Sequence, residues 1–272
     1  MLHTGGRVAA TTRKAARLRR GVPVLMYHLV SDDAPISPAA SWAGYTVTPS
    51  QFAAQVRALV RIGVTSISPE DLRVAHQDGG PLPPRPVVIT FDDGFRDCLR
   101  HAAPVLHDAG LRATMYVVAG LLGKTSRWLA PEGLENLPLV SSAEAGELEQ
   151  AGVECQSHSF SHPRLAGLPT ADITRELSRS REVLEDGLGH PVRHLAYPHG
   201  SYDGRVVAEA REAGYLTGCS TRPGKAVPDD DVLALPRVKV DGRGRSVDFL
   251  ARLTTGRDAR YPLRLLTGTS EG

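Results

Sequence analysis

Apolar positions along the chain form short strand-like runs, separated by longer stretches with helical spacing. Residues 48–63 show the helical unit, with Thr48, Pro49 and Gln51 at its start and Gly63 after its last apolar position. Thr, Pro and Gln at these places are typical of a helix N-terminus, and glycine suits the left-handed cap that ends a helix. Further helices are predicted near residues 96–109, 144–151, 171–186 and 203–213.

A strand-like run follows each predicted helix. These runs lie at 64–67, 113–118, 152–157, 194–197 and 215–219, and further runs occur at 22–27, 86–91 and 235–240. About eight strands alternating with five or six helices favour a parallel sheet closed as a barrel. We therefore expect an α/β fold with one barrel domain at 21–254, preceded by a tail at 1–20 and followed by an extension at 255–272.

Composition is ordinary for a globular protein, with 41% hydrophobic and 23% charged residues in 272. The three cysteines are far apart and form no CxxC, which argues against a disulfide framework and suits a reducing compartment. No apolar run approaches the 18 residues of a membrane span. We expect no stable membrane insertion and no nucleic-acid partner.

The first twenty residues carry six basic side chains and no acid. Without them the chain has 26 Lys and Arg against 30 acids, so its formal charge is −4. The stretch is expected to be a solvated, disordered tail. No cleavable apolar segment follows Arg20, and the expected location is therefore cytoplasmic.

Side chains that could bind a metal or transfer a proton follow two of the predicted strands. Asp92 and Asp93 follow the run at 86–91, and His158 and His162 follow the run at 152–157. Parallel β/α folds build their sites at the carboxyl ends of strands. Two histidines and one carboxylate are a standard ligand set for a catalytic metal, and the adjacent carboxylate is free to act as a base. The sequence therefore predicts a metal-dependent hydrolase.

The chain resembles the polysaccharide deacetylases of carbohydrate esterase family four, the NodB-homology domain. Three segments carry the resemblance: T-F-D-D-G at 90–94, H-S-F-S-H at 158–162 and Y-P-H-G at 197–200. It implies a distorted barrel of seven or eight strands, one divalent metal ion and hydrolysis of an N-acetyl group on an amino sugar. Zinc fits the ligands best, and nickel, cobalt or iron are alternatives.

The resemblance also implies a role for each motif. Asp92 would be the base, and Asp93, His158 and His162 the metal ligands. The third motif would supply the substrate groove and a backbone N–H for the oxyanion through Tyr197, Pro198 and His199. Trp128 is a further candidate for contact with a sugar ring.

Three departures from the family pattern matter. The third motif has Ala196 where the family usually has Arg, so Arg193 and Arg237 are both candidates to orient the base. The fourth, aspartate-tryptophan motif is not recognisable. No histidine follows His199, but Leu25-Met26-Tyr27-His28 reproduces the Leu-x-x-His pattern. This placement resembles the branch of poly-N-acetylglucosamine deacetylases, and it makes His28 the candidate general acid.

Two alternatives remain open at this point. The same scaffold can carry another carbon–nitrogen hydrolase that acts on an amide or imide. The chain can also be a catalytically silent carbohydrate-binding protein, although such a protein has no use for a base beside the ligands. The identity and length of the substrate, the metal and the oligomeric state are not fixed by the sequence.

Overall fold

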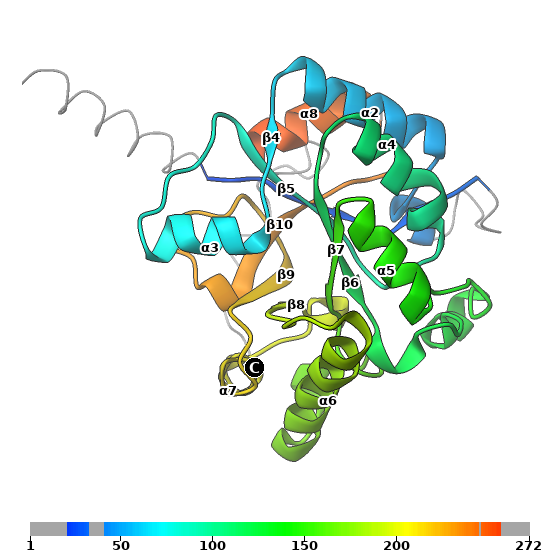
Figure 1. Cartoon of the computed structure of the whole chain (residues 1–272), viewed down its shortest axis with the longest axis vertical. Helices are drawn as coiled ribbons and strands as arrows, with labels where there is room; N and C mark the ends of the chain where they lie inside the picture. Colours follow the sequence, from blue (N-terminus) through cyan, green and yellow to red (C-terminus); the bar gives the residue numbers. More distant parts are fainter. Residues whose placement is uncertain (1–20, 33–40, 245, 257–272) are drawn as a thin grey trace, which may run out of the picture.

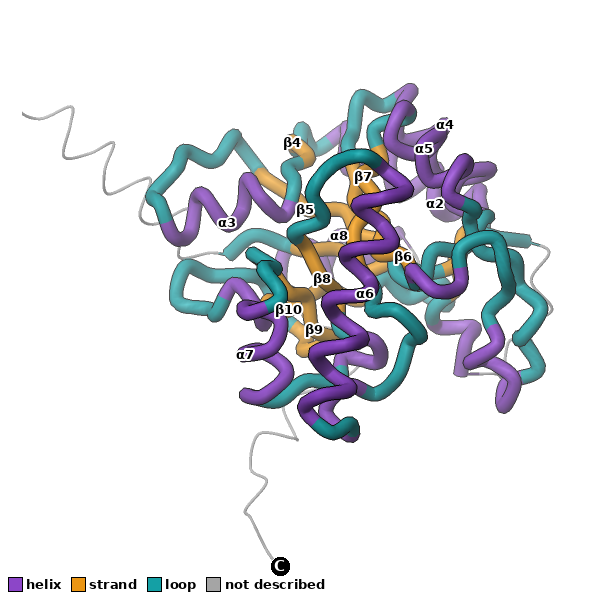
Figure 2. Tube along the Cα trace, turned by 60° about the horizontal axis from the view of Figure 1, so that its bottom comes forward, coloured by secondary structure: helices purple, strands orange, loops and turns teal. Residues whose placement is uncertain are grey.

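The computed structural model describes residues 21–32, 41–244 and 246–256. The predicted N-terminal tail and residues 257–272 of the predicted C-terminal extension lie outside this range. Within it, helices surround a central set of strands (Figure 1). The tube in Figure 2 shows the same arrangement from a second direction, with the strands enclosed by α3, α5, α6 and α7.

The strands form one eight-stranded sheet whose paired strands are all parallel. Its order is β1 (Val24–Tyr27), β10 (Leu235–Lys239), β9 (Thr217–Pro223), β8 (His194–Ala196), β7 (Val153–Ser157), β6 (Ala113–Val117), β5 (Pro86–Phe91) and β4 (Thr65–Ser66). Strand β1 also pairs with β5, with Val24 opposite Val88 and Tyr27 opposite Phe91. This pairing closes seven strands into a barrel and leaves β4 attached outside the ring. The predicted distorted (β/α) barrel is confirmed.

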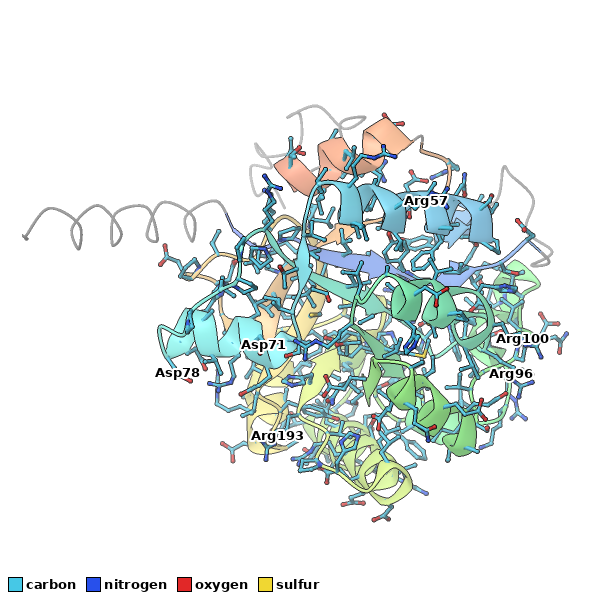
Figure 3. The ribbon with its side chains drawn as sticks, turned by 45° about the horizontal axis from the view of Figure 1, so that its top comes forward. Arg57, Asp71, Asp78, Arg96, Arg100 and Arg193 are labelled. Carbon is cyan, nitrogen blue, oxygen red and sulfur yellow. The ribbon has the colours of Figure 1, made fainter. Side chains whose placement is uncertain are left out.

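Helices lie on the outside of the barrel, and each of them except the last connects two strands. They are α2 (Pro49–Arg61), α3 (Pro69–Gln77), α4 (Ala103–Asp108), α5 (Ser142–Gln150), α6 (Thr170–Leu188), α7 (Gly204–Glu212) and α8 (Ser246–Thr255). Thr48, Ser68 and Ser141 each begin a helix with a reciprocal capping box. Charged side chains such as Arg57 on α2 and Asp71 on α3 lie on the outer surface (Figure 3).

Short helical turns occupy several loops. They are η1 (Ser41–Gly44), η2 (Cys98–Ala102), η3 (Ala119–Leu121), η4 (Arg127–Glu132), η5 (Leu165–Gly167), η6 (Pro198–Gly200) and η7 (Val232–Ala234). A separate two-stranded parallel sheet joins β2 (Leu29–Val30) to β3 (Thr46–Val47). It fixes the chain directly after β1 against the loop at 41–47.

The structure corrects several predicted elements. The helix expected at 96–109 begins as the π-helical η2 and continues as α4. The strand expected at 215–219 lies at Thr217–Pro223, because its pairing with β8 begins at Thr217 and its pairing with β10 extends to Pro223. The predictions also missed α3 and α8, together with the small β2–β3 sheet.

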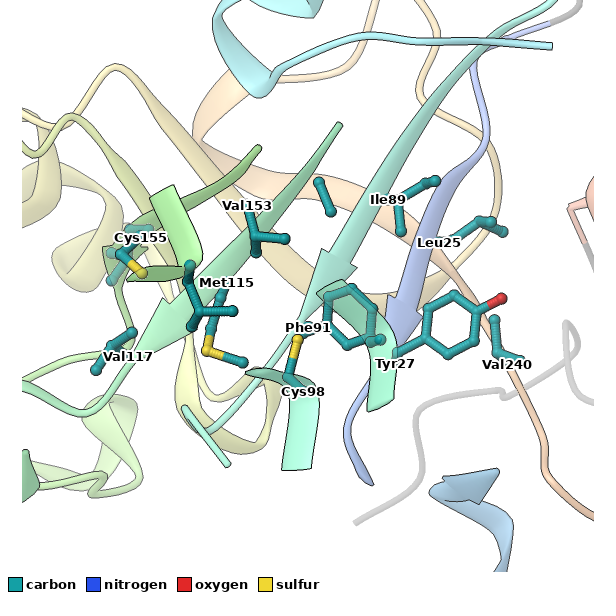
Figure 4. Packing of buried hydrophobic residues seen from close by; sticks show 14 of the residues in the cluster. Leu25, Tyr27, Ile89, Phe91, Cys98, Met115, Val117, Val153, Cys155 and Val240 are labelled. Carbon is teal, nitrogen blue, oxygen red and sulfur yellow. The ribbon is translucent and has the colours of Figure 1, made fainter. Parts of the chain in front are cut away.

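Alternate residues of each strand face the helices and the barrel interior. Outward-facing side chains such as Ile89, Phe91 and Met115 form the main core with the helices, and neighbouring strands place them side by side (Figure 4). Val88 belongs to a second cluster, together with Tyr116 and other residues of the interior. Because side chains alternate along a strand, Thr90 and Asp92 face the same way as Val88. The first carboxylate of the Asp-Asp pair is thereby aimed into the barrel.

Candidate active site

The candidate side chains meet at one end of the barrel because the strands that carry them are parallel. Asp92 and Asp93 follow β5, His158 follows β7 and His28 follows β1. Backbone bonds extend the pairing into these ends: the Asp92 N–H donates to the Tyr27 carbonyl (3.0 Å), and the His158 N–H donates to the Val117 carbonyl (2.9 Å). The residues therefore lie at the carboxyl ends of their strands, as predicted for a β/α barrel.

Asp93, His158 and His162 form a compact buried group. The Oδ1 atom of Asp93 lies 3.3 Å from Nε2 of His158 and 3.1 Å from Nε2 of His162. One ligand-type atom from each residue lies within 4.8 Å of the other two. Burial alone would raise the pKa of Asp93, but the two imidazoles beside it hold that pKa well below its usual value. The group can hold a metal ion.

The tautomer of His158 suits metal binding. Its Nδ1 lies 2.7 Å from the Ala196 carbonyl, which can only accept a hydrogen bond. Nδ1 therefore carries the proton and donates, so the lone pair of Nε2 points to the group with Asp93. A ligating histidine held through its other ring nitrogen is the usual arrangement in metal sites. The residues present thus fit the divalent ion that the sequence predicts.

Backbone strain is concentrated at this site. Five non-glycine residues in the described chain have positive φ, and four of them are Asp93 (74°), Ser159 (62°), His162 (67°) and His199 (58°). A non-glycine residue in the left-handed region costs roughly 1–3 kcal/mol and persists only where its surroundings hold it there. The strain is therefore consistent with side chains that are fixed in place for a function.

Arg237 holds the carboxylate of Asp92 in the barrel interior. Its Nη1 donates to Oδ1 of Asp92 (2.7 Å) and its Nη2 donates to Oδ2 (2.6 Å). Nη1 also donates to the hydroxyl of Thr90 (3.2 Å), which in turn donates to the Leu25 carbonyl. Both members of the ion pair are buried, with Arg237 1% and Asp92 2% exposed. Burial raises the pKa of Asp92, but the charge and hydrogen bonds of Arg237 outweigh it and lower that pKa below its usual value.

His28 also lies close to Asp92. Its Nε2 lies 3.9 Å from Oδ2 of Asp92, and its ring packs edge-on against Tyr45 (centroids 4.8 Å apart) and Trp42 (5.8 Å). Among the described residues, Nδ1 of His28 has no hydrogen-bond partner. Burial lowers the pKa of His28, and the carboxylates of Asp92 and Asp93 oppose that change. The Nε2 nitrogen of the imidazole therefore faces the carboxylate of Asp92.

Two aromatic contacts surround His162. The Trp128 ring stacks on it at 4.4 Å, and the ring of His199 meets it edge-on at 4.5 Å. Trp128 is half-buried and His199 is exposed, so both rings reach the outer side of the site.

Other predicted site residues lie elsewhere. Tyr197 is fully buried, its hydroxyl donates to the Leu233 carbonyl (2.7 Å) and its ring stacks on Tyr202, so it does not line a groove. Pro198 is also buried. Arg193 precedes β8 and lies exposed at the surface (Figure 3), at the opposite end of that strand from the site. Of the two candidate arginines, only Arg237 contacts Asp92.

Sequence reasoning missed the surroundings of the His-x3-His segment. Glu176 on α6 accepts hydrogen bonds from the segment between the two histidines, at the Phe160 and Ser161 N–H groups. Tyr45 was likewise not singled out, and Thr90 was recognised only as part of the T-F-D-D-G motif, without a role of its own. A glutamate on an amphipathic helix has the sequence signature of any solvated charge, so no pattern in the chain marks Glu176.

The closed parallel barrel has a buried carboxylate and two histidines at its strand ends, where β/α barrel enzymes build their active sites. The family model for polysaccharide deacetylases matches residues 79–218, and the chain belongs to this family. The matched region begins before β5 and ends within β9, so it contains the Asp-Asp pair and both histidines of the site.

Individual relatives agree with this assignment. The chain is 27% identical over 229 residues to the polysaccharide deacetylase-like protein YxkH of Bacillus subtilis, covering 84% of this chain and 73% of that protein. It is 23% identical over 205 residues to the poly-β-1,6-N-acetyl-D-glucosamine N-deacetylase of Staphylococcus aureus, covering 72% and 68%. The solved structure of the Streptococcus pyogenes deacetylase PplD in complex with acetate superposes with a TM-score of 0.75 at 25% identity, covering 86% and 98%.

Among the described residues, 21–32, 41–244 and 246–256, no helix is long and apolar enough to cross a membrane.

Proposed function

We propose that the protein is a metal-dependent deacetylase that hydrolyses the N-acetyl group of an N-acetylated amino sugar. The observation that carries the proposal is the pair of adjacent carboxylates: Asp93 lies against two imidazoles, while Asp92 is held apart from them by Arg237. Membership of the polysaccharide deacetylase family supports the same reaction class. One side chain is available for a metal ion and its neighbour for a proton.

Asp93, His158 and His162 would hold the ion. Two imidazoles and a carboxylate suit zinc, with nickel, cobalt and ferrous iron as alternatives. When bound, the ion would polarise the acetyl carbonyl and lower the pKa of a water molecule. The hydrogen bond from His158 Nδ1 to Ala196 keeps the imidazole in the tautomer that leaves Nε2 free for the ion.

Asp92 would act as the general base. The bidentate contact with Arg237 keeps Asp92 ionised at neutral pH and fixes the orientation of its carboxylate. Each oxygen accepts one hydrogen bond from the guanidinium and retains a lone pair, so a water at this end of the barrel can transfer its proton to Asp92.

His28 would protonate the leaving nitrogen. An amide nitrogen is a poor leaving group without a proton, and His28 is within 3.9 Å of Asp92, on the same side of the barrel mouth. Its contacts with Tyr45 and Trp42 limit the rotation of the imidazole. The backbone N–H of His199 would stabilise the oxyanion, while the rings of Trp128 and His199 would contact the sugar.

The substrate class is tested by acetate release. Purified protein is stripped of metal, reloaded with zinc and incubated with β-1,6- and β-1,4-linked N-acetylglucosamine oligomers, with N-acetylglucosamine, and with simple amides and cyclic imides. We expect acetate from the N-acetylated sugars, beginning with the β-1,6-linked oligomers because of the relationship to the staphylococcal enzyme.

An Asp92→Asn variant with its metal content verified serves as the matched control. Turnover of cyclic imides or simple amides alone would replace this proposal with another carbon–nitrogen hydrolysis. Sugar binding without acetate release by the loaded wild-type protein would identify a silent binding protein.

A further inference from the structure

We infer that Glu176 is a positioning residue for the candidate metal site, because it fixes the loop between His158 and His162 in its strained conformation. This inference rests on the proposed function. The carboxylate accepts three hydrogen bonds from the loop: from the Phe160 N–H (3.0 Å), the Ser161 N–H (2.9 Å) and the Ser161 hydroxyl (2.6 Å). Hydrogen bonds to an ionised acceptor are about twice as strong as those between neutral groups.

The loop needs such support because of its backbone. Ser159 and His162 have φ values of 62° and 67°, in the left-handed region that non-glycine residues rarely adopt. Ser159 and His162 both lie in the four-residue segment 159–162, and at roughly 1–3 kcal/mol each they store a few kcal/mol of strain. Without compensating contacts the loop would relax, and the His162 ring would move away from Asp93. The ligand geometry therefore depends on what holds residues 159–161.

Helix α6 holds the loop at a second point. Arg179, one helical turn after Glu176, places its guanidinium 4.4 Å above the ring of Phe160. Both contacts come from the same face of the helix, because residues three apart are neighbours on a helix surface. Glu176 thus fixes the backbone of the loop, and Arg179 fixes the one large side chain in it.

The opposite side of the loop is closed by η3. The Ala119 and Gly120 N–H groups donate to the carbonyls of Ser159 (3.1 Å) and Phe160 (2.8 Å). A Cβ at Gly120 would come within 2.6 Å of the Phe160 carbonyl oxygen, so only glycine fits there. The loop therefore lies between the backbone of η3 on one side and the carboxylate of Glu176 on the other. Removing a group that orients a metal ligand typically weakens metal binding by about 10–100-fold.

The test is the metal affinity of the apoprotein, measured without substrate. Zinc is titrated in competition with a chromophoric chelator into wild type, Glu176→Ala, Glu176→Gln and the control Glu182→Gln, an exposed glutamate on the same helix. We expect the dissociation constant of Glu176→Ala to rise by about 10–100-fold. Glu176→Gln, which keeps an acceptor oxygen but loses the charge, should fall between Glu176→Ala and wild type, and Glu182→Gln should match wild type.

A second readout separates positioning from a general loss of stability. The far-ultraviolet circular dichroism of each apoprotein establishes that it is folded at the temperature of the titration, and saturating zinc should return most of the acetate release to Glu176→Ala. If Glu176→Ala does not fold, the zinc affinity of Glu176→Gln is compared with that of wild type instead. Wild-type affinity in a folded Glu176 variant would overturn this inference alone. Absence of zinc binding by the wild-type protein would instead overturn the proposed function.

Discussion

Arg237 and Asp92 form a bidentate ion pair inside the barrel, with both oxygens of the carboxylate bound by the guanidinium at 2.7 and 2.6 Å. The two residues are 145 positions apart in the chain. They meet because β1 lies between β5 and β10 in the closed barrel, and Arg237 extends along the interior to the end of β5. The pair links the stability of the barrel to the orientation of the proposed base.

Loss of Arg237 should therefore be costly. Arg237→Met leaves a buried carboxylate without its partner, and breaking a buried pair in this way costs about 3–5 kcal/mol. We expect a loss of that size in the free energy of unfolding, measured by urea denaturation at pH 7.5. Adding Asp92→Asn to Arg237→Met should restore part of the stability, because the unpaired charge is gone.

The matched control is Arg222→Met, which removes an exposed partner of Asp230. Surface pairs of this kind contribute about 0–1 kcal/mol, so the change should be small. Equal losses for Arg237→Met and Arg222→Met would show that the interior pair has no special role.

The two adjacent aspartates should respond differently to substitution. Removing Asp93, His158 or His162 deletes a ligand, so alanine at any of these positions should strip metal and activity together. Asp92→Asn removes only the base, and it should retain one metal while turnover falls by about 10²–10⁴-fold. Elemental analysis and acetate release on the same samples provide the measurement. A fully loaded His158→Ala or His162→Ala protein would contradict the ligand set.

His28 should matter most for poor leaving groups. We expect His28→Ala to keep fold and metal and to lose about 10²–10⁴-fold in the hydrolysis of N-acetyl amides. The rate of aryl acetate hydrolysis should fall much less, because an aryloxide can depart without a proton. The ratio of the two rates is the informative quantity. If both fell by the same factor, the role of His28 would be something other than proton donation.

His194 gives a pH prediction outside the site. The residue is 3% exposed, its Nδ1 contacts the Thr217 hydroxyl (2.9 Å), and burial lowers the pKa of His194 from 6.5 to about 4. The unfolded chain therefore takes up this proton near pH 6.5 while the folded protein resists until about pH 4. Stability present above pH 6.5 is lost as the pH falls through this window, by about 3 kcal/mol from the size of the pKa change.

Urea denaturation at pH 7.5 and pH 5 tests this contribution. The difference in unfolding free energy between the two pH values should be smaller in His194→Gln than in wild type, because the variant lacks the contribution of His194. Some difference should remain, because other histidines titrate in both proteins. An identical pH dependence in the two proteins would show that His194 is protonated as readily in the folded state as in the unfolded one.

Much of the site could be predicted because its chemistry is local in the sequence. Asp92 and Asp93 follow a strand with an unbroken apolar run, and His158 and His162 follow another, so parallel pairing alone brings them to one end of a barrel. The same reasoning gave the barrel itself. Helix α8 was missed because its apolar face packs on α2, far away in the chain, and no strand follows it to mark the repeat.

The remaining contacts arise from closure of the barrel and from side-chain direction. Arg193 is near the third motif in sequence, but it lies at the amino end of β8, whereas Arg237 reaches Asp92 across the closed seam. Tyr197 belongs to a recognised motif, yet its ring faces the core. Glu176 touches the loop of the site only because α6 folds back over it. None of these relationships has a signature in the local sequence.

The most direct test of a metal-dependent deacetylation is a titration of zinc into the metal-free protein with acetate release followed at each step. The substrate is the N-acetylated oligomer that the screen identifies, and metal-free Asp92→Asn protein is titrated in parallel. We expect activity to rise in proportion to zinc and to saturate at one ion per chain, while Asp92→Asn binds the same single ion and releases acetate at least about 10²-fold more slowly. Full acetate release by the metal-free wild-type protein, or by Asp92→Asn, would contradict a metal-dependent deacetylation with Asp92 as its base.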